Sequence, residues 1–251
     1  MSKLFSLQGK IYVATRDTVT GKPKTPIWLG NVSQASMELT TDKSDKNESF
    51  SGNRLLYGSL QKSKGAKVTM TLDELLPENF AMALYGTQGS VTGATITAEV
   101  APTGLVVGDS IILAKPFASA IVVKDSTGSP VTLVLGTDYE ITSASRGIIK
   151  LLNVTAKTQP FKVDYTYAAY KNLAMFTNVT PPERYVIFDG INTVTGDKIL
   201  VDLYRMQFDP VSGFDLINED WGGLQLNAVA LYDEVNSLDA NLGGFGRLIT
   251  Q

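Results

Sequence analysis

The chain of 251 residues contains no cysteine and no histidine. Their absence excludes disulfide frameworks, zinc fingers, thiol nucleophiles and every catalytic arrangement that needs a serine–histidine or cysteine–histidine pair. Acidic and basic side chains nearly balance, 25 against 22, so the chain has no overall positive charge with which to hold nucleic acid tightly. We expect a protein that is not an enzyme and that needs no metal or cofactor.

Neighbouring acidic residues are the remaining candidates for carboxylate catalysis. They form three pairs: Asp73 and Glu74, Glu219 and Asp220, and Asp233 and Glu234. Consecutive residues of a strand point to opposite faces of the sheet, so such neighbours are poorly placed to flank one reacting bond. We therefore interpret these pairs as structural.

The sequence also lacks a long uninterrupted apolar run. The most apolar stretch, residues 106–123, is broken by Asp109 and Lys115, so it cannot provide a membrane span. Leu4 and Phe5 near the start are too few for the hydrophobic core of a signal peptide. We expect no membrane contact and a protein that stays in the cytoplasm.

Apolar and polar residues alternate along most of the chain, the pattern typical of strands with one buried face. The alternation is clearest in residues 36–40, 67–72, 161–167, 199–203 and 224–230. Threonine–glycine pairs between apolar runs predict tight turns. The sequence therefore predicts a mainly β fold.

One segment departs from this alternation. Pro77 suits the first turn of a helix and Gly86 its C-terminal end, so we expect a short helix over residues 77–85. The expected buried face of this helix consists of Phe80, Ala81 and Leu84. That face would close one side of the sheet.

Charge is distributed unevenly along the chain. Residues 41–65 are strongly polar, and residues 41–67 carry six basic against three acidic side chains, a local charge of +3. A polar loop of this length is usually functional or ordered only when bound; the alternative is a solvated hairpin tip. Residues 189–240 carry ten acidic against two basic side chains, a local charge of −8. The opposite charges predict complementary interaction surfaces.

Residues 92–170 are expected to form a separate small β domain. Glycine and proline mark its start, at Gly93 and Pro102, and Lys171 and Asn172 follow its end. Residues 1–91 and 171–251 would then form one discontinuous domain into which this unit is inserted.

Four segments near the N-terminus carry a specific pattern: residues 27–32 (IWLGNV), 47–55 (NESFSGNRL), 64–74 (KGAKVTMTLDE) and 77–86 (PENFAMALYG). In these segments the chain resembles the major tail tube proteins of long non-contractile-tailed bacteriophages, the siphophages. Residues 135–141 (LGTDYEI) and 147–150 (GIIK) are similar to small β domains of phage tail proteins. The resemblance covers about half of the chain, and the C-terminal third matches in pattern more than in motif.

The resemblance implies a tail tube β-sandwich or barrel with one short flanking helix and an inserted small β domain on the outside of the tube. It implies hexameric rings that stack into a hollow tube for DNA ejection. The partners implied are other copies of the chain, the tape measure protein, the tail terminator and tail tip proteins, and double-stranded DNA in transit without specific binding. The protein would be made in the host cytoplasm and end in the virion tail.

An acidic or neutral polar lining would repel DNA phosphates and keep the duplex mobile. The candidates for lumen-facing residues are Glu38, Thr40, Thr69, Thr71, Asp73, Asp197 and Asp202, for which ordinary exposed strand positions remain an equal alternative. The candidates for contacts between rings are Lys43, Lys46, Glu48, Phe50 and Arg54. Trp221 lies beside two glycines and is expected at an interface.

Two other functions remain open from the sequence. The tube subunit of a contractile injection machine would share the fold and the ring. A carbohydrate-binding β-sandwich would use exposed aromatic side chains such as Tyr165, Tyr167 and Tyr170. Tyr165 and Tyr167 alternate in step with Phe161 and Val163, which predicts that they belong to a core instead.

Overall fold

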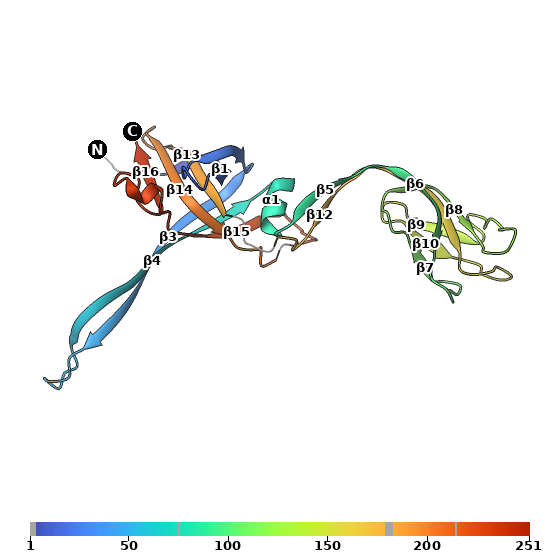
Figure 1. Cartoon of the computed structure of the whole chain (residues 1–251), viewed down its shortest axis with the longest axis horizontal. Helices are drawn as coiled ribbons and strands as arrows, with labels where there is room; N and C mark the ends of the chain where they lie inside the picture. The colour runs from blue at the N-terminus through green and yellow to red at the C-terminus, as the bar shows by residue number, and fades with distance from the viewer. Residues whose placement is uncertain (1–3, 75, 179–182, 214) are drawn as a thin grey trace. The chain divides into compact units, whose positions relative to one another are not determined.

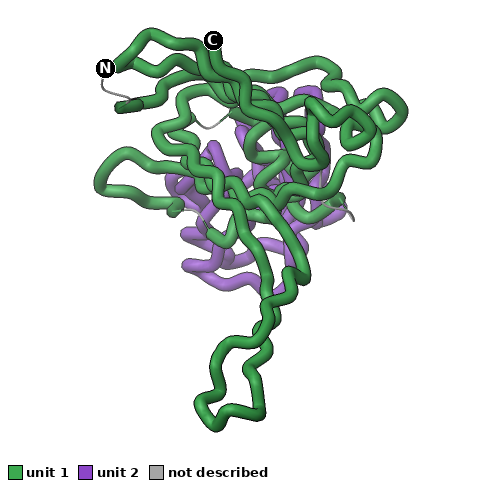
Figure 2. The backbone as a smooth tube through the Cα atoms, turned by 90° about the vertical axis from the view of Figure 1, so that its left-hand side faces the viewer, with its two compact units in different colours: residues 1–88, 173–251 green, residues 89–172 purple. Residues whose placement is uncertain are grey.

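The computed structural model describes residues 4–74, 76–178, 183–213 and 215–251. The chain divides into two compact units (Figure 2): unit 1 is Met1–Gln88 with Leu173–Gln251, and unit 2 is Gly89–Asn172. The sequence-based division placed these boundaries at 91/92 and 170/171, two or three residues away. No helix among the described residues is long and apolar enough to span a membrane.

Unit 1 is built on an eight-stranded sheet with the order β2-β1-β13-β14-β15-β4-β3, and β16 pairs with β14. Its strands are β1 (Leu7–Arg16), β2 (Pro23–Trp28), β3 (Val32–Asn47), β4 (Leu56–Leu72), β13 (Glu183–Asn192), β14 (Lys198–Phe208), β15 (Leu224–Ala230) and β16 (Gly246–Thr250). All neighbours are antiparallel. The mainly β fold that the alternation predicts is confirmed.

The inner face of this sheet forms the core of unit 1. Val68, Met70 and Leu72 of β4 alternate with exposed or half-buried residues, and Leu224 and Leu226 of β15 lie beside them in register. Burying each such side chain contributes roughly 1.5–3 kcal/mol. β1 and β3 lie near opposite edges of the sheet, yet residues of both line one cavity of about 730 Å³ together with residues of β13 and β14. The sheet is therefore strongly curved.

The short helix α1 (Pro77–Ala83) packs against this core and differs from the sequence-based expectation. The helix ends at Ala83. Two residues later the backbone of Tyr85 has a positive φ of 49°, which a right-handed α-helix does not contain. Its fully buried residues are Asn79, Met82 and Ala83, whereas Phe80, Ala81 and Leu84 are half-buried. The predicted buried face was therefore wrong, because the Asn79 side chain turns inward to donate a hydrogen bond to the Leu29 carbonyl at 2.9 Å.

Strands β3 and β4 continue well beyond the rest of the sheet as a long hairpin (Figure 1). The predicted polar loop over residues 41–65 is mostly strand, and only residues 48–55 connect β3 to β4. The sequence misled here because both faces of the projecting hairpin are exposed. A strand with two exposed faces has no reason to alternate apolar with polar residues.

Unit 2 is a small β domain of two three-stranded sheets, ordered β7-β10-β9 and β6-β11-β8. Its strands are β6 (Ala94–Val100), β7 (Ser110–Ile112), β8 (Ala118–Lys124), β9 (Tyr139–Ser143), β10 (Ile148–Leu151) and β11 (Lys162–Tyr167). Tyr165 and Tyr167 lie buried in its core beside Phe161 and Val163. The two tyrosines therefore do not form an exposed aromatic platform for sugars.

The chain leaves unit 1 in β5 (Thr87–Val91) and returns in β12 (Tyr170–Ala174), and these two strands pair with each other. The short 3₁₀ turn η1 (Asn236–Leu238) lies between β15 and β16.

Candidate assembly surface

The projecting end of the β3–β4 hairpin, residues 40–65, is called the arm here. Within it β3 is the only described strand that pairs with β4, because β15 reaches β4 only from Lys67 onward. Among the 26 residues of the arm, Glu48 alone is buried. A two-stranded hairpin with no core is marginally stable in water. We therefore interpret the arm as a segment that is stabilised by contact with a partner.

Large apolar side chains are exposed on the arm. Phe50 is 80% exposed, and its ring meets that of Tyr57 edge to face, with 6.2 Å between centroids. Leu55, Leu56 and Leu60 are each more than 60% exposed. Clusters of exposed apolar side chains on a soluble domain mark sites of protein association.

The tip of the arm is held in shape by the Glu48 carboxylate. It accepts hydrogen bonds from the backbone N–H groups of Phe50 at 2.7 Å and Ser51 at 2.8 Å, and from the Ser51 hydroxyl. The Ser51 hydroxyl bond and the backbone donors lower the pKa of Glu48 to about 2. Glu48, predicted as a contact between rings, thus lies inside the tip, where it positions Phe50.

The other predicted contact residues, Lys43, Lys46 and Arg54, are exposed on the arm together with Phe50. The structure brings all of them onto one projecting element. Arg54 lies in the turn at the tip with a φ of +51°. Few residues other than glycine adopt this left-handed backbone conformation.

Four of the predicted lumen residues share one polar face. Glu38 and Thr40 of β3 and Thr69 and Thr71 of β4 all point to the side of the sheet opposite the core, as the register with the buried positions of β4 requires. The face continues onto β15, where the Thr69 hydroxyl donates to the Asn227 side-chain oxygen at 3.1 Å. The face is polar but not purely acidic.

Lys67 contributes the positive charge on this polar face. It lies directly opposite Glu38 in the β3–β4 register and is exposed. Because Glu38 and Lys67 are directly opposed and carry opposite charges, their charges cancel and this part of the polar face is close to neutral.

The three remaining lumen candidates each interact with a neighbouring side chain. Asp73 follows β4 and accepts hydrogen bonds from the side chains of Asn31 at 2.6 Å and Ser33 at 2.7 Å. Asp197 accepts the Thr195 hydroxyl in the turn between β13 and β14. Asp202 of β14 is ion-paired with Arg247 at 2.8 Å, and only 14% of its side chain is exposed. Asp73 continues the side of β4 that carries Thr69 and Thr71, because it lies two residues after Thr71, whereas Asp197 lies in a turn and Asp202 is held in its ion pair.

Trp221 lies in the connection between β14 and β15, residues 209–223, called the acidic loop here. Its side chain is 98% exposed, and Leu216 and Ile217 of the same loop are 84% and 93% exposed. Sequence reasoning missed the two aliphatic residues. The sequence does show two apolar residues between Asp215 and Glu219, in a segment that has neither the alternation of a strand nor the period of a helix.

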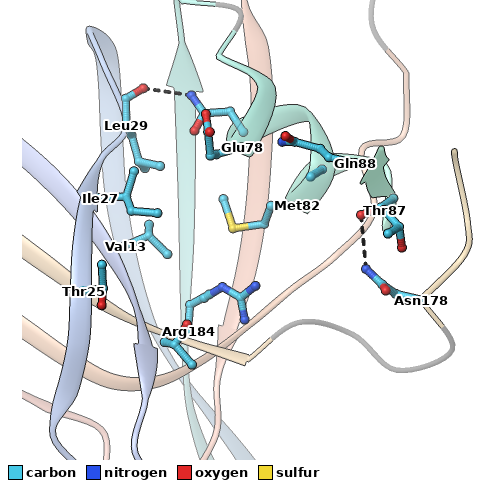
Figure 3. Close-up of a pocket in the computed structure, with 14 residues that line it drawn as sticks. Val13, Thr25, Ile27, Leu29, Glu78, Met82, Thr87, Gln88, Asn178 and Arg184 are labelled. Atoms are coloured by element: carbon cyan, nitrogen blue, oxygen red, sulfur yellow. Dashed lines mark hydrogen bonds between the residues drawn. The ribbon is translucent and has the colours of Figure 1, made fainter. Parts of the chain in front are cut away.

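A separate cavity of about 400 Å³ lies between β1, β2 and α1 (Figure 3). Val13, Ile27, Leu29 and Met82 line it, and Arg184 extends into it from β13 (Figure 3). Burial lowers the pKa of Arg184. The described residues include no cluster of three or more acidic, cysteine or histidine side chains that could hold a metal ion.

The chain matches a family model described as protein of unknown function UCP028589 over residues 4–249. The match includes both units. No curated protein matches the chain.

Proposed function

The chain belongs to this family of unknown function, UCP028589, and we propose that it is a structural virion protein that forms the tail tube of a siphophage. In this proposal its copies close into hexameric rings, the rings stack into a hollow tube, and the genome passes through the tube during ejection. The observation that carries the proposal is the arm, a long hairpin with exposed apolar side chains and no core of its own.

The edges of the unit 1 sheet support closure into a ring. β3 has β4 as its only neighbour among the described strands and extends over 16 residues without a proline. A long unpaired edge of this kind invites another strand, and pairing around a closed ring removes it. At the opposite edge, β2 contains Pro23 and Pro26, which weaken its ability to pair, so only the β3 edge supports closure.

The polar face supports a passage for DNA. A surface rich in lysine and arginine would hold phosphates and slow the duplex, whereas a near-neutral polar surface has no such affinity. Thr69, Thr71 and the opposed pair of Glu38 and Lys67 provide a surface of the second kind. In the proposal this face lines the tube.

Other tail proteins complete the proposed setting. The tube would contact the tape measure protein along its lumen and the tail terminator and tail tip proteins at its ends. The subunit would be made in the host cytoplasm and reside in the virion tail.

Shortening the arm tests this proposal. Residues 44–60 are replaced by an Asn-Gly turn, which joins Lys43 to its register partner Gln61 with a tight hairpin. We expect the shortened protein to fold, because none of the removed residues belongs to the core of unit 1, but to stop at monomers or single rings where the full chain forms stacked rings and tubes. Analytical ultracentrifugation measures the assembly, and circular dichroism checks the fold. A shortened protein that assembles as the full chain does would contradict the proposal.

A further inference from the structure

The acidic loop is anchored at both ends and exposed between them. The Asp209 N–H donates to the Asn227 carbonyl at 2.8 Å, and the Val211 N–H donates to the Ala83 carbonyl at 2.8 Å. At the other end the loop enters β15 at Leu224, opposite Leu72 of β4. All its described residues from 215 to 223 are exposed. The loop therefore presents its apolar side chains to solvent from fixed ends.

The loop carries four carboxylates and no basic residue: Asp209, Asp215, Glu219 and Asp220. None of them takes part in an ion pair with another described residue. Exposed apolar side chains thus lie among unneutralised negative charges. This combination fits a partner surface that is both apolar and basic.

The arm has these two properties. It carries five basic residues against three acidic ones, and none of the five is ion-paired with a described residue: Lys43, Lys46, Arg54, Lys62 and Lys64. Its exposed apolar side chains gather around the tip, at Phe50, Tyr57 and Leu60. The arm and the acidic loop are therefore complementary in charge and alike in apolar exposure.

The two surfaces are attached at opposite ends of one strand. The acidic loop joins the sheet beside Leu72, the last residue of β4, and the tip of the arm precedes Leu56, the first. The 17 residues of β4, at about 3.3 Å each, separate these ends by roughly 50 Å. The loop and the tip of one copy therefore cannot meet each other. Complementary patches at opposite ends of a molecule join copies head to tail and leave a free patch at each end.

We propose that the acidic loop of one copy binds the arm of a second copy, and that this head-to-tail contact joins successive rings. The inference rests on the proposed tube function and names the two surfaces through which successive rings would stack. Trp221, Leu216 and Ile217 would pack against the apolar side chains of the tip, while the loop carboxylates face the arm cations.

Reciprocal charge reversal tests the contact. One variant reverses the loop (Asp215→Lys with Glu219→Lys), a second reverses the arm (Lys43→Glu with Lys46→Glu), and a third combines all four changes. A charge-matched control reverses Glu140 and Glu234, which lie outside both surfaces, to lysine. Electron microscopy measures tube length, and analytical ultracentrifugation measures the size of the assemblies.

We expect each reversed pair alone to shorten tubes at least tenfold, to rings or short stacks. The combined variant, and an equimolar mixture of the two single variants, should restore long tubes, because each then pairs opposite charges again. Normal tubes from the loop variant, or a combined variant that stays as short as either single one, would overturn the inference while leaving the tube function intact. A wild-type protein that never assembles would overturn both.

Discussion

The buried ion pair between Arg16 and Asp233 fastens the segment after β15 to the sheet of unit 1. The Asp233 side chain is fully buried, and its two oxygens accept the Arg16 guanidinium at 2.6 and 2.8 Å. Burial alone would raise the pKa of Asp233, but the Arg16 guanidinium and the amide donors of Asn236 outweigh it and hold the pKa at about 2. The adjacent Glu234 is exposed. Two neighbouring carboxylates in the sequence thus have different environments, although neither lies in a strand.

Replacing Asp233 should therefore cost far more stability than replacing its neighbour. We expect Asp233→Ala to lower the free energy of unfolding of unit 1 by about 3–5 kcal/mol, because it leaves the Arg16 charge buried without a partner. Glu234→Ala, the matched control, should change it by less than about 0.5 kcal/mol. Denaturant unfolding followed by tryptophan fluorescence measures both. Equal losses from the two variants would contradict this role of Asp233.

The pH dependence of stability has a definite sign for the same residue. The folded-state pKa of Asp233 lies below its ordinary value of 3.8, so its contribution is fully present above about pH 4. It is lost as the pH falls through about 2. The Asp233→Ala variant should therefore lose less stability than the wild type when the pH is lowered from 5 to 2.

The arm shows which elements the sequence could predict and which it could not. The end of β4 from Ala66 to Leu72 was predictable, because one face is buried and the residues alternate accordingly. The strands of the arm were not, because solvent on both faces removes the alternation and leaves a composition typical of loops. The buried face of α1 depended on one hydrogen bond, from Asn79 to Leu29, and its end on the positive φ of Tyr85, and a helical period reveals neither.

The same reasoning applies to the predicted interaction residues of the arm and the acidic loop. Lys43, Lys46 and Phe50 were predicted as contact residues from the charge and composition of their segment, and they are exposed on the arm. The role of Glu48 inside the tip could not be found, because its partners become neighbours only when the turn forms. Leu216 and Ile217 of the acidic loop gave no periodic signal, so their exposure emerged only from the fold.

The order of the arm tip should depend on the Glu48 charge. In Glu48→Gln the ionised acceptor is lost, and the charge-assisted bonds to the N–H groups of Phe50 and Ser51 weaken. We expect faster amide hydrogen exchange in residues 48–55 with no change in the core strands. Asp45→Asn, which alters a carboxylate that accepts the Ser59 hydroxyl on the exposed strand surface, is the control. Unchanged exchange at the tip of Glu48→Gln would show that Glu48 does not hold the tip.

Unit 1 has two complementary surfaces, the arm and the acidic loop, and the loop of one copy cannot reach the tip of the arm of the same copy. The basic, apolar arm and the acidic, apolar loop are attached roughly 50 Å apart along β4, and the outer edge of β3 pairs with no other described strand. Each feature is a liability in an isolated monomer, since exposed apolar patches and open edges promote association. Lateral pairing of sheets and head-to-tail contact of arms with loops would satisfy both in one assembly. Charge contacts of this kind weaken with salt, whereas apolar ones persist.

Negative-stain electron microscopy of the purified full chain, over a range of protein and salt concentrations, tests the tube assignment most directly. We expect hollow rings at low protein concentration and tubes of stacked rings as the concentration rises, with longer tubes at low salt. Dispersed monomers at every condition, together with amide hydrogen exchange showing a fully protected arm, would contradict it, because an arm that is already stable alone needs no second copy.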